Sequence, residues 1–474
     1  MEEVREVKTE VQESKLGIMP INKLLISTSL PMMVSMLVLA LYNVVDSFFI
    51  GKYDPTGIGV AALSYAFPIQ NLMTAFSVGT GVGVNALLSK SLGEKNKELV
   101  DKTANNAVLI YAATFVLIAL LGLVLPEPIF RMQKASDQAI QYGLEYLPIV
   151  MYCSFGMFAQ GCMERLLIST GRTMYSMITQ LAGAVVNIVM DPILIFGYLG
   201  MPAMGVKGAA IATVAGQIVS AILGIIFNRR FNPEITLSFR MMKPDWWVIR
   251  DIYKVGLPSI VMNSISSIMV FAMNFILNAF TEAAVTVFGL YFKLQSFVFM
   301  PVFGMNSGVV PIEAYNYGAG RPDRIKQTIR CAVCYAVGIM VVGLLIFELF
   351  PGQLLELFTE ETRVVELGTI ALRIIAIHFP LAGASIMFTS SLQALGRPIR
   401  SLIVSVSRQL VVLVPCAKLL SLTGNLSLVW LAFIIAELVS LTMVGLFLKD
   451  TVKSIHKELE GKSSVTEEAV SVTK

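Results

Sequence analysis

The stretch GTGVGVNALLSKSLGEKNK (79–97) returns in the second half of the chain as NSGVVPIEAYNYGAGRPDR (306–324). The two stretches align at an offset of 227 residues, so that Gly81 and Gly93 fall opposite Gly308 and Gly320. A second match pairs LLISTGRTMYSMITQLAG (166–183) with SLQALGRPIRSLIVSVSR (391–408) at an offset of 225 residues. This repeat decides the architecture, because it predicts a chain built from two related halves.

The composition is that of a membrane protein. Of the 474 residues, 55% are hydrophobic and only 14% are charged, and the mean hydropathy is +0.73. A soluble domain carries roughly 25% charged residues. Apolar windows of about 20 residues predict an all-α polytopic fold with twelve transmembrane helices near residues 22–50, 58–90, 103–129, 143–169, 173–198, 206–228, 248–280, 283–315, 323–351, 365–393, 398–421 and 426–449.

Each half holds six of these helices, and six is an even number. The halves therefore enter the membrane in the same sense, as a 6+6 parallel repeat of two pseudo-symmetric bundles, an arrangement typical of transporters that alternate access by moving one bundle against the other. The expected units are a tail (1–20), an N-lobe bundle (21–228), a linker (229–246), a C-lobe bundle (247–449) and a second tail (450–474).

The distribution of basic residues predicts the orientation. With the N-terminus in the cytoplasm, the tails and the loops after even-numbered helices hold about 27 of the 36 lysines and arginines, as the positive-inside rule requires. Both termini are then cytoplasmic. The first tail reads as a solvated segment, and the charged, Ser/Thr-rich second tail is expected to be disordered.

Two aspartates lie inside apolar stretches. Asp46 is in LPMMVSMLVLALYNVVDSFFIG (30–51) and Asp191 is in AVVNIVMDPILIFGYLG (184–200). A carboxylate placed there costs at least about 2.5–3.5 kcal/mol on insertion scales, so intramembrane acids mark functional sites by default. Helical spacing puts Tyr42 and Asn43 on the face of Asp46, and Asn187 on the face of Asp191.

These groups suit a coupling cation. Carboxylate and amide oxygens, with the carbonyl that Pro192 leaves free, are hard ligands for Na⁺, and a desolvated carboxyl can instead exchange a proton. The alternative is that each aspartate only accepts hydrogen bonds within a polar bundle core. The positions opposite Asp46 and Asp191 in the second half, Met273 and Val414 or Cys416, are not acidic. The cation site is therefore expected in the first half alone.

The second half instead carries bases at depth, Lys293 and Arg408, with Arg373 and His378 in the tenth predicted helix. We expect Lys293 and Arg408 either to line a cleft or gate or to pair with an acid or with carbonyls. His378 is either a core histidine or a proton carrier. Further candidates for cleft or gating groups are Gln70 and Asn71 after Pro68, Gln295, Met300, and Glu164 with Arg165, each with local packing or hydrogen bonding as the alternative.

Several classes of function are disfavoured. No G-x-x-x-x-G-K-[ST] motif occurs, so ATP is not expected as the energy source. The chain has two histidines and no H-E-x-x-H, which argues against an intramembrane metalloenzyme. Cys331 and Cys334 form a single C-x-x-C without a second pair, which favours simple packing over a metal or redox role. We expect no cofactor, no enzymatic activity and no nucleic-acid partner.

Three stretches resemble the multidrug and toxic compound extrusion (MATE) family over residues 20–450. They are LYNVVDSFFIG (41–51), the segment that begins GRTMYSMITQLAG and ends AAIATVAGQ (171–217), and FKLQSFVFMPVFGMNSGVVPIEAYNYGAGRPDRI (292–325). The resemblance implies a twelve-helix, two-lobe bacterial exporter in the plasma membrane that exchanges Na⁺ or H⁺ for drugs or other organic, often cationic, molecules. In the branch with an N-lobe cation site, the key groups match Asp46, Asn187 and Asp191.

Another branch of that family uses a Glu in the seventh helix and an Asp in the tenth, and this sequence has neither. A lipid-linked oligosaccharide flippase of the same superfamily is the alternative, since Lys293 and Arg408 would suit a pyrophosphate headgroup. A channel is a further possibility, distinguished by stepwise currents. The expected partners are a small-molecule substrate and the lipid bilayer, with the monomer as the functional unit.

Overall fold

The computed structural model describes residues 14–54, 58–133, 135–359 and 361–472, with backbone only for 42–44, 47, 60, 239 and 459–472. Helices make up nearly all of it. The first half contains α1 (Lys15–Ile18), α2 (Ile21–Tyr53), α3 (Ile58–Gly93), α4 (Lys97–Leu121), α5 (Pro126–Met132), α6 (Asp137–Tyr152), α7 (Phe155–Ser169), α8 (Thr173–Phe196) and α9 (Val206–Phe231). The second half contains α10 (Trp246–Asn278), α11 (Glu282–Gly318), α12 (Pro322–Leu349), α13 (Pro351–Glu356), α14 (Thr362–Ala376), α15 (Phe379–Ala394), α16 (Pro398–Val406), the π-helix η3 (Ser407–Leu413), α17 (Val414–Ser421), α18 (Leu426–Val429) and α19 (Leu431–Val472).

The predicted fold class, an all-α bundle of twelve spans, is confirmed. Among the described residues, ten helices are long and apolar enough to cross a membrane, and α14 with α15 forms an eleventh span bent by 48°. The pair α6 and α7 occupies the place of α14 and α15 in the first half, and corresponds to the helix predicted over 143–169. Asp137 begins α6 and Thr362 begins α14, so the two broken spans are separated by the same 225 residues as the second sequence match.

Several predicted helix bounds are wrong. The helix expected over 103–129 ends at Leu121, because two prolines that cannot continue it, Pro126 and Pro128, begin the separate helix α5. The helix expected over 143–169 is interrupted at Cys153 and Ser154. The second tail is not disordered along its length: α19 continues through it to Val472.

Ion pairs hold the beginning of that extension against the bundle. Arg400 Nη1 lies 2.7 Å from Asp450 Oδ2, and Arg397 Nη2 lies 3.2 Å from Glu458 Oε1. Helix α19 is thus already anchored where it leaves the apolar region, and adding residues to an existing helix is far easier than nucleating a new one.

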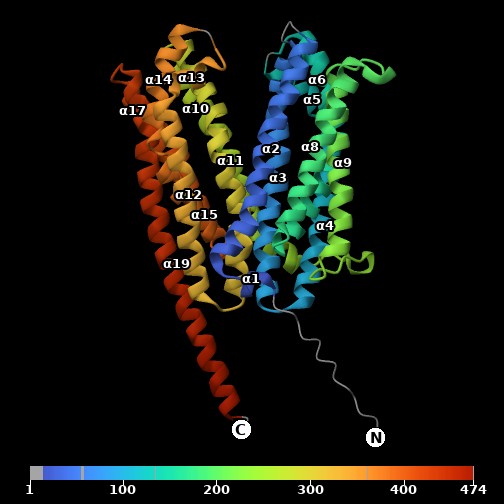
Figure 1. Cartoon of the computed structure of the whole chain (residues 1–474), viewed down its shortest axis with the longest axis vertical. Helices are drawn as coiled ribbons and strands as arrows, with labels where there is room; N and C mark the ends of the chain where they lie inside the picture. Colours follow the sequence, from blue (N-terminus) through green and yellow to red (C-terminus); the bar gives the residue numbers. More distant parts are fainter. Residues whose placement is uncertain (1–13, 55–57, 134, 360, 473–474) are drawn as a thin grey trace.

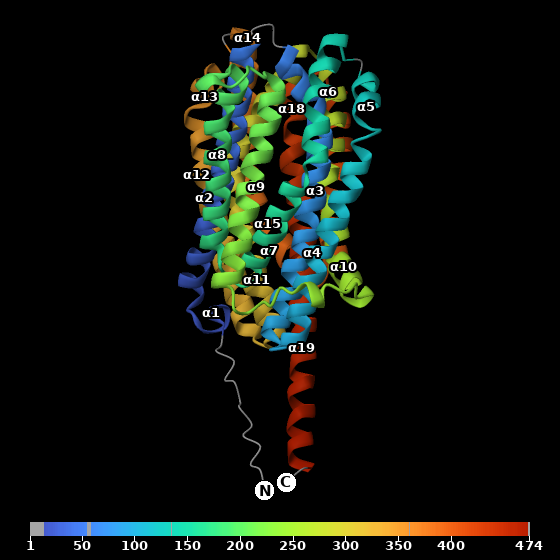
Figure 2. The same cartoon turned by 90° about the vertical axis from the view of Figure 1, so that its right-hand side faces the viewer.

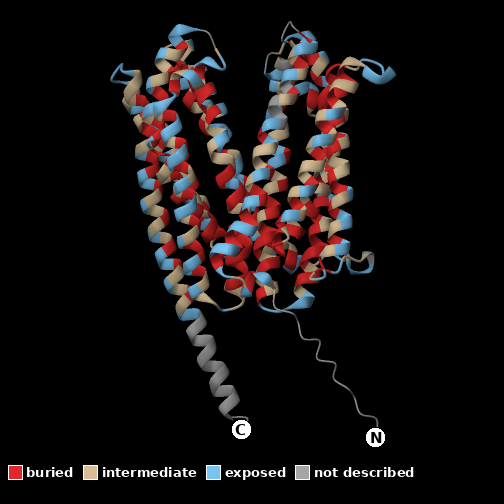
Figure 3. Ribbon diagram, viewed as in Figure 1, coloured by how far each residue is buried: buried red, intermediate tan, exposed pale blue. Residues whose placement is uncertain are grey.

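The helices form two lobes (Figures 1 and 2). Helices α2 to α9 build the N-lobe and α10 to α19 build the C-lobe. Helix α1 and the C-terminal part of α19 lie at the same end of the molecule, which we call the terminal end, and the lobes diverge towards the opposite end (Figure 1). The buried residues between the lobes gather near the terminal end (Figure 3).

Glycines allow the lobes to meet closely at the terminal end. A Cβ atom at Gly79 of α3 would lie 2.7 Å from the backbone nitrogen of Ile260 in α10. A Cβ atom at Gly304 of α11 would lie 2.6 Å from the carbonyl oxygen of Met32 in α2. We call this contact between the lobes, at Gly79 with Ile260 and at Gly304 with Met32, the seam. Each lobe contributes one glycine-bearing helix to it, and a larger side chain at either glycine would push the lobes apart.

The last residues of the predicted solvated tail are instead docked at the terminal end. Leu16 is fully buried, and Arg324 Nη2 of α12 donates to the carbonyl oxygens of Leu16 and Met19 at 3.2 and 2.8 Å. On the N-lobe side, Lys15 lies near Arg172; burial, and then the Arg172 guanidinium, lower the pKa of the Lys15 ammonium. The segment thus touches both lobes where they close.

Candidate cation site

Two helices of the N-lobe bring the predicted acids together. Helix α2 carries Asp46, and α8, which packs against it, carries Asn187 and Asp191 on successive turns of one face. Asp191 is fully buried, Asn187 is 3% exposed and Asp46 is 9% exposed. The three residues that the sequence placed in one site therefore converge in the interior of the N-lobe.

The two carboxyl groups face each other without a counter-charge. They lie within hydrogen-bonding reach of one another. Among the described residues, no donor lies within reach of either carboxylate oxygen of Asp191. Two facing carboxylates repel, so a hydrogen bond between them requires that they share a proton, and otherwise a cation must lie between them. The geometry thus requires a proton or another cation between the two carboxyl groups.

Asn187 ties the pair to the neighbouring helix. In the amide orientation that satisfies both of its polar atoms, Asn187 donates to Asp46 Oδ1 at 2.9 Å and accepts from the backbone N–H of Thr213 in α9 at 3.1 Å. This arrangement fixes the Asp46 carboxylate and leaves the Asp191 oxygens available. The side chains of Tyr42 and Asn43, the other groups predicted for this face, lie outside the described residues.

Tyr146 of α6 is a site residue that the sequence analysis missed. Its side chain is 4% exposed, and its hydroxyl accepts a hydrogen bond from Gln70 Nε2 of α3 at 2.8 Å. The same hydroxyl lies near Thr213, Asp46 and Asp191. Gln70, predicted as a cleft group, therefore belongs to the surroundings of the acid pair. The only signal for Tyr146 was a tyrosine two residues before Pro148 in an apolar span.

The donor set favours a proton or an alkali cation. Carboxylate, amide and hydroxyl oxygens are the ligands of hard cations. The described residues contain no group of three or more His, Cys, Asp or Glu side chains placed to hold a metal ion. Two facing carboxyls that lack a counter-ion can bind a proton or Na⁺ and release it again, which is the chemistry that coupled transport needs.

The C-lobe also contains buried acids, but each has a basic or hydroxyl partner. Glu437 of α19 is 3% exposed, and its Oε2 lies 3.3 Å from Arg408 Nη1 in the π-helix η3. Glu313 of α11 is fully buried, and its Oε1 accepts from Ser391 Oγ at 2.9 Å. The C-lobe thus also buries acids, although neither of the two occupies a position opposite Asp46 or Asp191.

The predicted basic residues of the C-lobe do not converge on one site. Arg408 adopts one of its two predicted roles, pairing with an acid. Arg373 Nε lies 3.9 Å from Glu348 Oε2, with both side chains substantially exposed. His378 is buried, and its Nδ1 faces the carbonyl oxygen of Ile375. Lys293 is exposed on α11.

The remaining candidates lie apart from the acid pair. Gln295 and Met300 are half-buried on α11. Glu164 of α7 accepts hydrogen bonds from Gln160 Nε2 and Gln180 Nε2 at 3.0 and 2.8 Å, so it makes the local pairing that was its alternative. Asn71 reaches the other lobe, where its Nδ2 lies 3.4 Å from Ser267 Oγ of α10.

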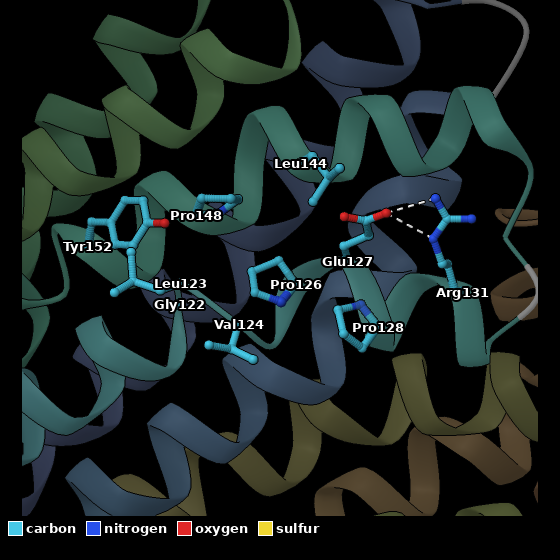
Figure 4. A pocket seen from close by; sticks show the side chains of 10 residues that line it. All are labelled: Gly122, Leu123, Val124, Pro126, Glu127, Pro128, Arg131, Leu144, Pro148 and Tyr152. Carbon is cyan, nitrogen blue, oxygen red and sulfur yellow. Dashed lines mark hydrogen bonds and ion pairs between the residues drawn. The ribbon is translucent and has the colours of Figure 1, made fainter.

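A surface pocket of about 640 Å³ lies elsewhere in the N-lobe, between the end of α4, α5 and α6 (Figure 4). Its charged lining residues, Glu127 and Arg131, satisfy each other at 2.7 Å. Pro126, Pro128 and Pro148 line much of the rest. Neither acid, nor Asn187 or Tyr146, is among its lining residues, so this pocket is separate from the acid pair.

Comparison with known families gives one consistent result. The family profile named MatE matches residues 31–193 and 258–417, one block in each lobe and more than half of the chain in total. Multidrug export protein MepA of Staphylococcus haemolyticus is 27% identical over 419 residues, which cover 88% of this chain and 91% of that protein. A FAD transporter of Shewanella oneidensis is 26% identical over 413 residues, covering 84% and 88%.

Solved structures share the whole fold. One, described as the outward-facing conformation of a multidrug resistance MATE family transporter of the MOP superfamily, aligns with a TM-score of 0.88 at 24% identity, over 94% of this chain and 99% of that one. A MOP superfamily transporter from Pyrococcus furiosus, described as having a binding pocket of reverse polarity that suggests a different function, aligns with a TM-score of 0.88 at 25% identity, over 94% and 98%.

Proposed function

The chain belongs to the MATE family of multi-pass membrane transporters, and from that premise we propose that it exports organic, often cationic, small molecules in exchange for an inward-moving cation. The observation that carries the coupling half of this proposal is the Asp46–Asp191 pair, buried and without a counter-charge among the described residues. Export of drugs is supported by the similarity to MepA proteins over most of both chains.

The acid pair would bind its cation while the lobes are apart at the end opposite the termini. In that arrangement the terminal end is closed by the glycine seam, so a cation reaches the pair only from the open side. Binding removes the repulsion between the carboxylates and lets Asp46, Asn187 and Asp191 draw together. Alternating access then requires that the loaded N-lobe favour a different lobe arrangement from the empty one.

The orientation in the membrane follows from the same proposal. We propose that both termini lie in the cytoplasm of a bacterial cell, which the concentration of basic residues at the terminal end supports. The open end then faces outward in the plasma membrane. Substrate leaves on that side, and the coupling cation enters from it.

Retention of a cationic dye in cells tests this proposal. We expect cells expressing the wild-type protein to expel the dye, and cells expressing Asp46→Asn or Asp191→Asn to retain it. Asp137→Asn is the matched control, because Asp137 is an exposed acid in the first turn of α6. Undiminished efflux by both site variants would contradict the proposal.

The flippase alternative is not favoured. Arg408, one of the two bases that kept it open, has an acid partner in Glu437 and is not free for a pyrophosphate. Because one relative is a FAD transporter, FAD belongs in the substrate panel beside the dyes. Saturable efflux of FAD without dye efflux would move the substrate class from drugs to anionic dinucleotides.

A further inference from the structure

Two consecutive amides in the middle of α3 touch the acid pair's surroundings on one side and the opposite lobe on the other. We propose that Gln70 and Asn71 transmit the occupancy of the Asp46–Asp191 site to the contact between the lobes. This inference rests on the proposed function, because it assumes that the acid pair binds the coupling cation. It assigns Gln70 and Asn71 as positioning residues, which contact neither the cation nor the substrate.

Gln70 receives the signal through Tyr146. The Gln70 side chain donates to the Tyr146 hydroxyl at 2.8 Å, and that hydroxyl lies near Thr213, Asp46 and Asp191. A tyrosine hydroxyl has a single proton to donate. An empty carboxylate pair attracts that proton electrostatically, and a pair that holds a cation attracts it less. Loading the site therefore changes the electrostatic field at the Tyr146 hydroxyl and the preferred direction of its proton, and Gln70 donates to the oxygen of that hydroxyl.

Asn71 delivers the signal to the C-lobe. Successive residues of an α-helix point about 100° apart, so adjacent side chains on α3 can face different neighbours. Asn71 Nδ2 lies 3.4 Å from Ser267 Oγ of α10. Asn71 is half-buried and Ser267 is exposed, so water can compete for this bond and small movements of α3 can break it.

The Asn71–Ser267 contact lies towards the open end of the seam, where a change in the angle between the lobes moves the two helices furthest. Helices α3 and α10 run antiparallel. The backbone of α10 comes close to that of α3 at two glycines, where Ile260 lies against Gly79 and Ile252 lies against Gly83. Asn71 lies eight residues before Gly79, about 12 Å further towards the open end. The Asn71–Ser267 bond therefore lies beyond the tightly packed part of the seam, at the point where the lobes begin to separate.

Distances between the open ends of the lobes test the inference. Spin labels at Met132→Cys of α5 and Leu422→Cys after α17 report this separation, because both side chains are largely exposed, at 82% and 72%. The five native cysteines are replaced first. The two treatments are Na⁺ added at fixed pH, and acidification without Na⁺. We expect one of them to shift the wild-type distance distribution, and Asp46→Asn to abolish the shift.

In Asn71→Ala and in Ser267→Ala we expect at least about half of that shift to be lost. The Na⁺ or proton concentration that gives half of the effect should move less than about two-fold. The double variant should lose no more than either single variant, because both remove the same bond. Gln70→Leu should lose the shift and also move the half-effect point several-fold, because it removes a donor to Tyr146.

Thr74→Ala and Ser264→Ala are the matched controls. Both hydroxyls lie on the same two helices but bond only to a carbonyl of their own helix, those of Gln70 and Ile260. A full wild-type shift in both Asn71→Ala and Ser267→Ala would overturn the inference while leaving the proposed function intact, provided that Asp46→Asn still abolishes the shift. A wild-type protein that responds to neither treatment would contradict the inference and the proposed function together.

Discussion

The two lobes share one topology but stabilise their buried acids in opposite ways. In the N-lobe, Asp46 and Asp191 face each other with no cation among the described residues to balance them. In the C-lobe, Glu437 lies against Arg408. An acid with a fixed counter-ion has little need of a mobile one, whereas a facing acid pair must acquire a positive charge. The comparison indicates that the buried acids of the N-lobe are suited to bind a mobile cation, whereas the Glu437–Arg408 pair of the C-lobe is suited to stabilise the bundle.

The seam is where the lobes resemble each other again. Gly79 of α3 packs on α10 and Gly304 of α11 packs on α2, each with backbone close to the missing side chain. The repeat is thus preserved where both lobes perform the same task, which is to close the terminal end. It has diverged at the acid pair, since the positions opposite Asp46 and Asp191 are not acidic.

The largest effect that this comparison predicts is at the acid pair. Asp46→Asn, Asp191→Asn and the double variant should each reduce cation-driven efflux at least about tenfold, equivalent to about 1.4 kcal/mol of lost coupling. Because the two carboxyls share one charge, the double variant should be no worse than the worse single variant. Initial rates of dye efflux across the four proteins measure this. Additive losses would mean that the acids act separately.

The next effect is at the seam. Gly83→Ala places a methyl group against the Ile252 carbonyl, and Gly304→Ala places one against the Met32 carbonyl. Each should cost the closed terminal end about 1–3 kcal/mol and shorten the distance between the open ends. Gly289→Ala is the control, because a Cβ atom there meets nothing within 4 Å. An effect at one of these two glycines and not at the other would contradict the claim that both lobes close the terminal end in the same way.

A smaller effect, on stability alone, is expected at the C-lobe ion pair. Glu437→Gln leaves Arg408 without its partner and should lower the unfolding free energy by roughly 1–2 kcal/mol, a range reduced because Arg408 is partly exposed. Thermal unfolding in detergent measures this. The double variant Arg408→Met/Glu437→Leu should recover the loss. Loss of cation coupling in a stable Glu437→Gln protein would place a second coupling site in the C-lobe.

The smallest effect is expected at Glu313. This fully buried carboxyl has one hydroxyl partner and an Oε2 without a partner among the described residues, an arrangement that hydrocarbon surroundings favour only for the uncharged form. Glu313→Gln is nearly isosteric and uncharged, so it should change the unfolding temperature and the efflux rate little. Glu313→Asp, which keeps the carboxyl group but shortens the side chain, provides the contrast. A large loss in Glu313→Gln would show that its charge is used.

Much of the fold was readable from the sequence because membrane spans are decided by length and hydrophobicity. The convergence of Asn187 and Asp191 followed from helical spacing, and their meeting with Asp46 from the family resemblance. The contribution of Tyr146 did not follow, since it depends on how α6 packs against α3 and α9. Helix spacing within one segment contains no information about such contacts.

Other misses were avoidable or had a local cause. Glu437 stands in LAFIIAELVSL, as plain an intramembrane acid as Asp46, and it accounts for the depth of Arg408. The burial of Leu16 could not be foreseen, because its pocket is built by residues about 300 positions away, including Ile312 and Tyr315. Hydropathy windows also miss breaks such as Cys153–Ser154, where the apolar character continues across the interruption.

The central claim is that the Asp46–Asp191 pair, and no group of the C-lobe, binds the coupling cation. Efflux from proteoliposomes under a pH gradient and under a Na⁺ gradient, imposed separately, tests it most directly. We predict that one gradient drives wild-type efflux, that neither drives Asp191→Asn, and that the same gradient still drives Glu437→Gln. Gradient-driven efflux by Asp191→Asn at the wild-type rate would contradict the claim.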